Sequence, residues 1–133
     1  MRSVSVMERE PHEPYIEKFG RNPDFIVEYV WNPDPEYMEA KRFQGMRSDF
    51  LYEGDDPAVD GIHMIWPEFL DSSGQVILQR DEEVSAEGYA NMWILMDERN
   101  PYHEKRMKPG TKGHMVAGSK ILADVTVIQT NFK

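Results

Sequence analysis

The residues of this chain best suited to acid–base or metal chemistry are four histidines, His12, His63, His103 and His114. A catalytic or metal-binding pair needs two imidazoles on adjacent strands or two to four positions apart. None of the four has another histidine within four positions in the sequence. His103 and His114 could still meet across a hairpin. One hypothesis is therefore a small-molecule-binding or catalytic site near these two residues.

Carboxylates gather in two short segments that could contact a basic partner. The first contains Asp55, Asp56 and Asp60, and the second contains Asp81, Glu82 and Glu83. Neither has the spacing of a calcium-binding loop, in which alternating acidic residues lead to a glutamate at the twelfth position. Exposed carboxylates accelerate the encounter with a positively charged protein. We predict that both segments form the rim of a protein-binding site.

A basic segment lies between Arg99 and Lys120, where six Lys and Arg residues face one acid, Glu104, for a local net charge of +5. Such a segment could contact phosphates and so indicates RNA binding as a further hypothesis. The net charge of the whole chain is −9, which opposes nucleic-acid binding. The basic residues assigned to this alternative patch are Arg99, Lys105, Arg106, Lys108 and Lys112.

An apolar corner is expected at Trp66 and Phe69. Pro67 lies between them and has no N–H to donate to a neighbouring strand. Large aromatic residues are enriched at the centres of protein interfaces. We therefore predict that Trp66 and Phe69 contribute to the same partner-binding surface as the acidic segments.

Composition limits the other functional classes. The chain has 133 residues and no cysteine, which excludes disulfides, thiolate catalysis and iron–sulfur or zinc sites with cysteine ligands. Its sequence contains no phosphate-binding Gly-x-x-x-x-Gly-Lys-Ser/Thr loop and no Gly-x-Ser-x-Gly nucleophile motif. We expect a non-enzymatic protein without a cofactor or metal. Neither a signal-peptide apolar region nor a long apolar run is present, so we expect a cytoplasmic protein.

The elements that must position these residues are short strands. Turn signals recur about every 8 to 14 residues, and no segment sustains a helical apolar period, a pattern typical of all-β domains. The sequence predicts a single antiparallel β-barrel, closed or partly open, over residues 24–133, after an irregular N-terminal extension over 1–23. A short helical turn is expected over 15–19. The expected extended segments are 25–31, 43–52, 61–66, 75–79, 89–96, a strand through 114–116, and 121–128.

The order of these segments resembles the C-terminal β-barrel domain of elongation factor Tu, and small stand-alone bacterial proteins built on it, over about residues 24–129. The similarity rests on the opening strand 25–31, on the glycine, arginine and alternating aromatics of 43–52, and on the closing half 89–129. Ser48 stands where that family usually has proline, and the turn after Ala117 has fewer glycines. The resemblance implies a barrel that serves as a surface for macromolecular partners, including tRNA.

These observations favour a binding module over an enzyme. The leading hypothesis is a cytoplasmic barrel that binds another protein, most plausibly a basic one, as an immunity protein or antitoxin binds a basic toxin. The alternatives are the small-molecule or catalytic site near His103 and His114, and an RNA-binding barrel resembling the translation factor. The sequence leaves the oligomeric state open.

Overall fold

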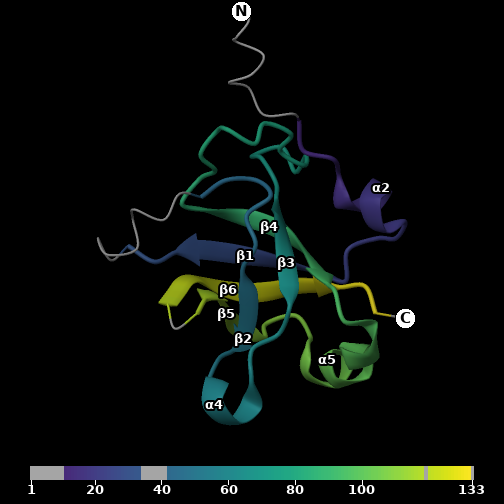
Figure 1. The fold of residues 1–133 in the computed structure, drawn as a ribbon, viewed down its shortest axis with the longest axis vertical. Helices are drawn as coiled ribbons and strands as arrows, with labels where there is room; N and C mark the ends of the chain where they lie inside the picture. Colours follow the sequence, from purple (N-terminus) through teal and green to yellow (C-terminus); the bar gives the residue numbers. More distant parts are fainter. Residues whose placement is uncertain (1–10, 34–41, 119, 133) are drawn as a thin grey trace, which may run out of the picture.

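The computed structural model describes residues 11–33, 42–118 and 120–132. In these residues six strands form one antiparallel sheet, which curls into a small, partly open β-barrel (Figure 1). The strands are β1 (Phe25–Trp31), β2 (Asp49–Tyr52), β3 (Ile65–Phe69), β4 (Glu87–Ile94), β5 (Lys112–Ala117) and β6 (Lys120–Thr130). The helices are α2 (Tyr15–Phe19), α4 (Pro57–Asp60), the 3-10 turn η1 (Asp97–Arg99) and α5 (Asn100–Arg106). The prediction of an all-β barrel is confirmed.

The barrel is open between its two outer strands. The strand order is β2-β5-β6-β1-β4-β3, so β2 and β3 are the outer strands. They meet at one end, where the N–H groups of Phe50 and His63 each donate to the other residue's carbonyl at 2.8 Å. Further along β3, the side chain of Gln44 replaces a strand, because its amide bonds to both the N–H and the carbonyl of Phe69 at 2.8 and 3.0 Å.

Strand β1 shows why these residues fold as a barrel. Phe25, Val27, Tyr29 and Trp31 are buried in the core, and Glu28 between them is exposed. This period of two places alternate side chains inside the barrel. Strand β1 pairs with β4 on one side and β6 on the other, and therefore lies at the centre of the sheet.

Residues 11–24 pack on the outer face of β3 and β4, where α2 lies beside the sheet in Figure 1. Tyr15 and Phe19 contact Trp93 with ring centroids 6.1 and 5.6 Å away. The buried Glu68 carboxylate binds the Tyr15 N–H at 2.8 Å and His12 Nε2 at 2.6 Å. The predicted helical turn at 15–19 is confirmed. The first ten residues of the predicted extension lie outside the described residues.

Several predicted element boundaries are wrong. The segment 43–46 is a turn with Gly45 at φ 94°, so β2 begins only at Asp49. The predicted strand 75–79 makes only one bridge, between Val76 and Leu70. Strand β3 continues through Pro67, which an outer strand tolerates. The expected turn and basic segment before Lys108 contain η1 and α5 instead.

Every helix in the described residues is too short or too polar to cross a membrane.

Candidate functional site

Two histidines that are far apart in the sequence meet at one end of the barrel. The rings of His63 and His103 lie edge to face with centroids 4.7 Å apart, and both side chains are buried. His63 is held by its backbone bridge to Phe50, and His103 projects from α5. His114 lies on β5, where its Nδ1 is 2.8 Å from the Asp124 carboxylate. The structure thus pairs His103 with His63 instead of with His114.

Arg106 lies on the two tyrosines that contact His63, Tyr52 and Tyr102. Its guanidinium donates two hydrogen bonds to the Asp55 carboxylate, at 2.8 and 3.1 Å, and lies over the Tyr52 ring, 3.8 Å from the centroid. It also donates to the Tyr102 hydroxyl at 2.6 Å. The hydrogen bond from Arg106 lowers the pKa of Asp55, and the bond to Asp55 raises the pKa of Arg106. Asp55 and Arg106 therefore form an ion pair in which each charge offsets the other, instead of a free acid and a free base.

Both buried histidines are uncharged near neutral pH. Burial, followed by the proximity of His63 and Arg99, lowers the pKa of His103 from 6.5 to about 4. Burial and then Arg99 also lower the pKa of His63. The Tyr52 hydroxyl is 2.7 Å from His103 Nδ1, and burial raises the pKa of that phenol. The two rings and the phenol therefore form a neutral hydrogen-bonding group inside the barrel end.

A cavity of about 270 Å³, here called the histidine cavity, opens beside this pair. His63 and His103 both line it, and its apolar walls come from Ile62, Met64, Ile94 and Met96. Asp60 and Arg99 also line it and place one charge of each sign there. Among the described residues, no group lies within hydrogen-bonding distance of the buried His63 Nε2. Trp31 Nε1, Ser48 Oγ, Trp93 Nε1 and Asn100 Oδ1 are likewise buried without a partner among the described residues. What makes this cavity a candidate binding site is its lining, which combines two histidines with apolar walls.

Exposed apolar side chains line the histidine cavity or adjoin its lining residue Asp60 in the sequence. We call this surface the α4 face and define it by Val59, Ile62, Met64 and Met96, whose exposed fractions are 80%, 39%, 48% and 43%. Ile62, Met64 and Met96 are shared with the cavity, and Val59 lies on α4. Clustered exposed apolar residues with a polar rim are typical of interaction surfaces.

Four exposed acidic residues border the α4 face. Asp56 and Asp60 bracket α4, where each accepts a backbone hydrogen bond at 2.9 Å, from Ala58 and from Asp56 itself. Asp97 and Glu98 follow Met96 directly in the sequence and are exposed in η1. Two of the predicted rim residues, Asp56 and Asp60, therefore lie beside the α4 face.

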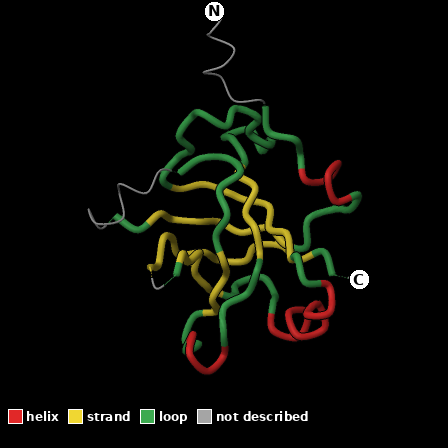
Figure 2. Tube along the Cα trace, viewed as in Figure 1, coloured by secondary structure: helices red, strands yellow, loops and turns green. Residues whose placement is uncertain are grey.

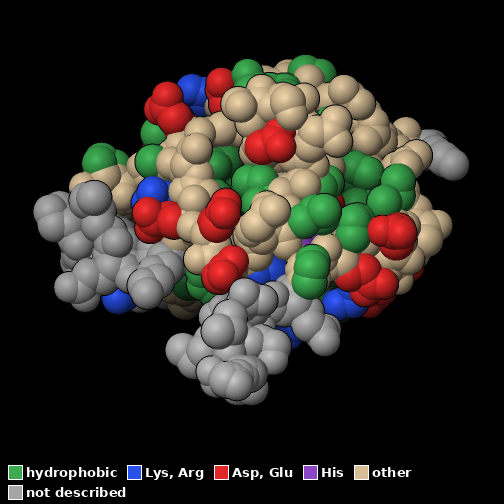
Figure 3. Space-filling model, turned by 90° about the horizontal axis from the view of Figure 1, so that it is seen from above, with side chains coloured by type: hydrophobic (Ala, Val, Ile, Leu, Met, Phe, Trp, Pro, Cys, Tyr) green, Lys and Arg blue, Asp and Glu red, His purple; other side chains and the backbone are tan. Residues whose placement is uncertain are grey.

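The other predicted partner-binding residues lie elsewhere. Asp81, Glu82 and Glu83 are exposed in the β3–β4 connection, at the opposite end of the molecule from α4 (Figures 1 and 2). Figure 3 views that end and shows separate acidic side chains instead of one continuous patch. The expectation that both acidic segments form one rim is therefore wrong, because the barrel separates them.

The predicted apolar corner at Trp66 and Phe69 is also wrong. Phe69 is fully buried, and its ring packs against Tyr29 with centroids 5.2 Å apart. Trp66 is half-buried on the opposite face of β3, with the Arg47 guanidinium 4.4 Å from its ring centroid. Strand β3 continues through Pro67, so its side chains still alternate between the two faces.

The residues of the predicted basic patch have different surroundings. Arg99 lies over the Tyr102 ring at 4.9 Å, beside the histidine cavity, and Arg106 is paired with Asp55. Lys105, Lys108 and Lys112 are exposed on or after α5 and at the start of β5. The part of the chain that the structure describes contains no cluster of three or more histidine or acidic side chains that could hold a metal ion.

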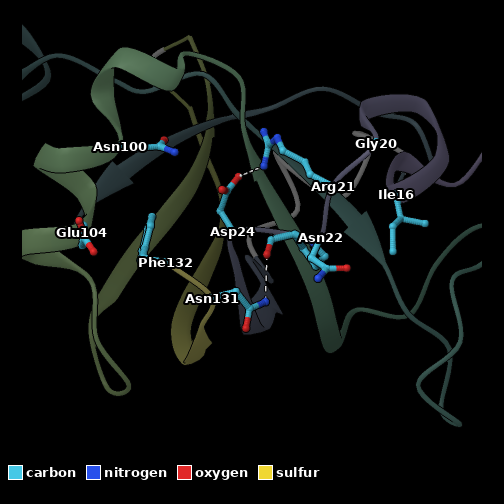
Figure 4. A pocket seen from close by; sticks show the side chains of 10 residues that line it. Ile16, Gly20, Arg21, Asn22, Asp24, Asn100, Glu104, Asn131 and Phe132 are labelled. Carbon is cyan, nitrogen blue, oxygen red and sulfur yellow. Dashed lines mark hydrogen bonds and ion pairs between the residues drawn. The ribbon is translucent and has the colours of Figure 1, made fainter.

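A larger hollow, of about 780 Å³, lies between α5 and residues 16–24 (Figure 4). Its one arginine, Arg21, already donates to the Asp24 carboxylate at 2.8 Å and to the Ile94 carbonyl at 2.7 Å. Asn131 is likewise bonded to backbone across the hollow. The partly buried Asn100 contributes one carbonyl oxygen without a partner among the described residues. Arg21, Asp24 and Asn131 therefore join residues 20–24 to the barrel instead of facing a ligand.

Sequence reasoning assigned no role to Tyr52, Val59, Met64, Met96 and Tyr102, and it placed a site at His103 and His114 instead of at His103 and His63. The alternation over 61–66 placed His63 and Ile65 on one side and Ile62 and Met64 on the other. The structure bears out this alternation, with His63 inside and Met64 outside. What the pattern could not reveal is which element His63 would face.

Comparisons with protein-family models, with curated proteins and with solved structures gave no match. The resemblance to the barrel of elongation factor Tu therefore stays a prediction, and the site has to be interpreted from its own geometry.

Proposed function

We propose that this protein is a non-enzymatic binding module that recognises a basic protein through the α4 face. The observation that carries this proposal is the coincidence of exposed apolar side chains with an acidic border at one end of the barrel. An apolar centre within a polar rim is the usual anatomy of a protein interface. Methionine is also enriched at such centres, and Met64 and Met96 both belong to this face.

The two parts of the α4 face would contribute differently to binding. Complete burial of a Val, Ile or Met side chain is worth about 1.5 to 3 kcal/mol, so the apolar centre would supply most of the affinity. The acidic rim would mainly raise the association rate and exclude acidic competitors. The net charge of −9 acts in the same direction over longer distances.

The more specific proposal is an immunity-type or antitoxin-type inhibitor of a basic toxin. Its support is the combination of a small barrel, a net negative charge and an acid-rimmed apolar face. The same combination argues against RNA as the ligand, because Asp55 offsets the charge of Arg106 and a net charge of −9 repels phosphates.

Matched charge reversals test this proposal. The tagged protein is used to capture partners from lysate of its source organism at low and high salt, and retained proteins are identified by mass spectrometry. The test variant is Asp97→Lys with Glu98→Lys, beside the α4 face. The control is Asp81→Lys with Glu82→Lys, which changes the net charge equally at the opposite end of the molecule.

We expect wild type and control to retain the same basic protein in a stoichiometric amount, and the test variant to lose it at moderate salt. Met64→Ser with Met96→Ser should lose it even at low salt, because these changes remove the apolar centre. Equal retention by all variants, or retention of an acidic protein, would contradict the proposal.

A further inference from the structure

Three cations from distant parts of the chain gather at the outer face of β3. We call Lys18, Arg47 and Arg80 the cationic cluster. Lys18 Nζ and the Arg47 guanidinium lie 5.9 and 4.4 Å from the ring centroid of Trp66. Lys18 Nζ is also 5.8 Å from the ring centroid of Tyr15. These two charges therefore approach the same aromatic group, although one comes from α2 and the other from the segment before β2.

Arg80 belongs to the same group. Burial is the largest cause that raises the pKa of Tyr15, and Glu68 raises it further, whereas the positive charges of Arg47 and Arg80 lower it. Both guanidinium groups therefore act on one phenol. The Arg80 guanidinium also lies against Gly45, where a β-carbon would be 3.0 Å from one of its nitrogens. Because Gly45 is only two residues before Arg47, this contact holds the two arginines in one region.

The cationic cluster has no counterion among the described residues, since none of its three members forms an ion pair there. The Glu68 carboxylate does not serve, because it is buried and engaged by His12 Nε2 and the Tyr15 N–H. Lys18 and Arg47 are exposed and Arg80 is partly exposed, so solvent anions can reach them. Other arginines of the described residues, in contrast, are paired with carboxylates: Arg21, Arg42 and Arg106.

The donors of the cluster favour a phosphate group over a carboxylate. A phosphomonoester carries about −1.5 to −2 charges near pH 7 and has three strong acceptor oxygens. Each guanidinium can donate two parallel hydrogen bonds to such a group, and the ammonium adds a point charge. A single carboxylate would compensate only one of the three positive charges.

Neighbouring acids limit the size of the anion. Glu17 precedes Lys18 and Asp81 follows Arg80, and both carboxylates are exposed. An extended polyanion such as RNA would be repelled by these residues and by the net charge of −9. The cluster therefore suits a compact anion.

We propose that the cationic cluster binds the phosphate group of a phosphomonoester, with Arg47 and Arg80 as donors and Lys18 as a supporting charge. Trp66 and Tyr15 hold these cations at the surface of the barrel. The cluster lies beside α2, which is well separated from α4 in Figure 1. This inference therefore goes beyond the proposed function and does not depend on the α4 face.

The first test titrates inorganic phosphate into the wild-type protein at pH 7.5, with acetate and chloride as controls at matched ionic strength. NMR follows the Trp66 indole N–H and the Nε–H groups of Arg47 and Arg80. We expect saturable shifts of all three signals at millimolar phosphate, and about fivefold weaker binding of acetate because of its single charge. Absence of saturation, shifts confined to other residues, or equal binding of acetate would overturn the proposal.

Matched charge removals locate the site. Arg47→Gln and Arg80→Gln should each weaken phosphate binding by about three- to fivefold, the size expected for one exposed ion pair. Arg99→Gln is the control, because Arg99 is also an exposed arginine over a tyrosine ring and its replacement changes the net charge equally. Equal weakening by all three would show an effect of net charge alone and overturn the proposal. Thermal unfolding curves check that the variants fold, and the wild-type titrations decide the matter if one does not.

Two phosphomonoesters then distinguish the source of the phosphate. One is a phosphoserine within a short blocked peptide, acetyl-Ala-phosphoserine-Ala-amide, and the other is glycerol 3-phosphate. Tighter binding of the peptide than of inorganic phosphate would support the proposal and assign the site to a phosphorylated protein. Tighter binding of glycerol 3-phosphate would support it and assign the site to a small metabolite. Binding of inorganic phosphate without either ester would indicate an adventitious ion only and overturn the proposal.

Discussion

Protonation of His103 should destabilise the fold in mildly acidic solution. The imidazole is 1% exposed and is held between Tyr52 and His63. Its pKa falls from 6.5 to about 4 on folding, with burial as the largest cause. Between these two values the unfolded chain binds a proton that the folded protein does not bind. The stability from this residue is therefore complete above pH 6.5 and is lost as the pH falls toward 4.

The magnitude follows from the size of that shift. A change from 6.5 to about 4 corresponds to about 3 kcal/mol of unfolding free energy over the whole interval. Between pH 7 and pH 5 the loss from this one group is about 2 kcal/mol. A small domain has a total stability of only about 5 to 15 kcal/mol, so the effect should be readily measurable.

The assay is urea-induced unfolding at pH 7 and at pH 5, for wild type and for His103→Asn. Asparagine places an amide near the position of Nδ1, so it can still bond to Tyr52 but does not titrate. We expect the wild type to lose about 2 kcal/mol more than the variant between the two pH values. Comparison with the variant removes contributions from His63 and from the carboxylates, which both proteins share.

The reasoning would be refuted if wild type and variant lost equal stability over this interval. NMR gives an independent check, because the His103 ring should remain neutral at pH 5.5 in the folded protein. A titration of His103 near 6.5 would show that the ring is not held in the buried, hydrogen-bonded position.

Two further substitutions test the contacts that hold the site and the N-terminal segment. Arg106→Lys should lower the unfolding free energy by about 1 to 2 kcal/mol, because lysine cannot make both bonds to Asp55 while it lies over Tyr52; urea unfolding measures this, and an unchanged midpoint would contradict it. Glu68→Ala should cost about 1 to 3 kcal/mol, because His12 and the Tyr15 N–H lose their buried acceptor. Limited proteolysis should then cleave near α2 faster than in the wild type, and an unchanged cleavage rate would show that this pair does not hold residues 11–24.

Strand alternation and turn chemistry could be predicted from the sequence because both are local. The buried positions of β1, the helical turn at 15–19 and the closing strands follow from neighbouring residues alone. Helix α5 was missed although local signals were present: Pro101 in its first turn, and Lys105 and Arg106 in its last. The basic side chains were interpreted as a surface segment, and their position at a helix end was overlooked.

The composition of the site depends on contacts that no local pattern contains. His63 and His103 meet because the bridge from Phe50 brings the start of β3 against β2, and α5 then covers the same end. Asp55 and Arg106 lose their expected roles for a similar reason, since the fold places them together. The sequence by itself determined an acidic all-β barrel, because alternation and charge belong to each segment separately. Only the tertiary structure decided which histidines are buried together and which carboxylates remain free, because those properties depend on pairs of residues that the closing of the barrel brings into contact.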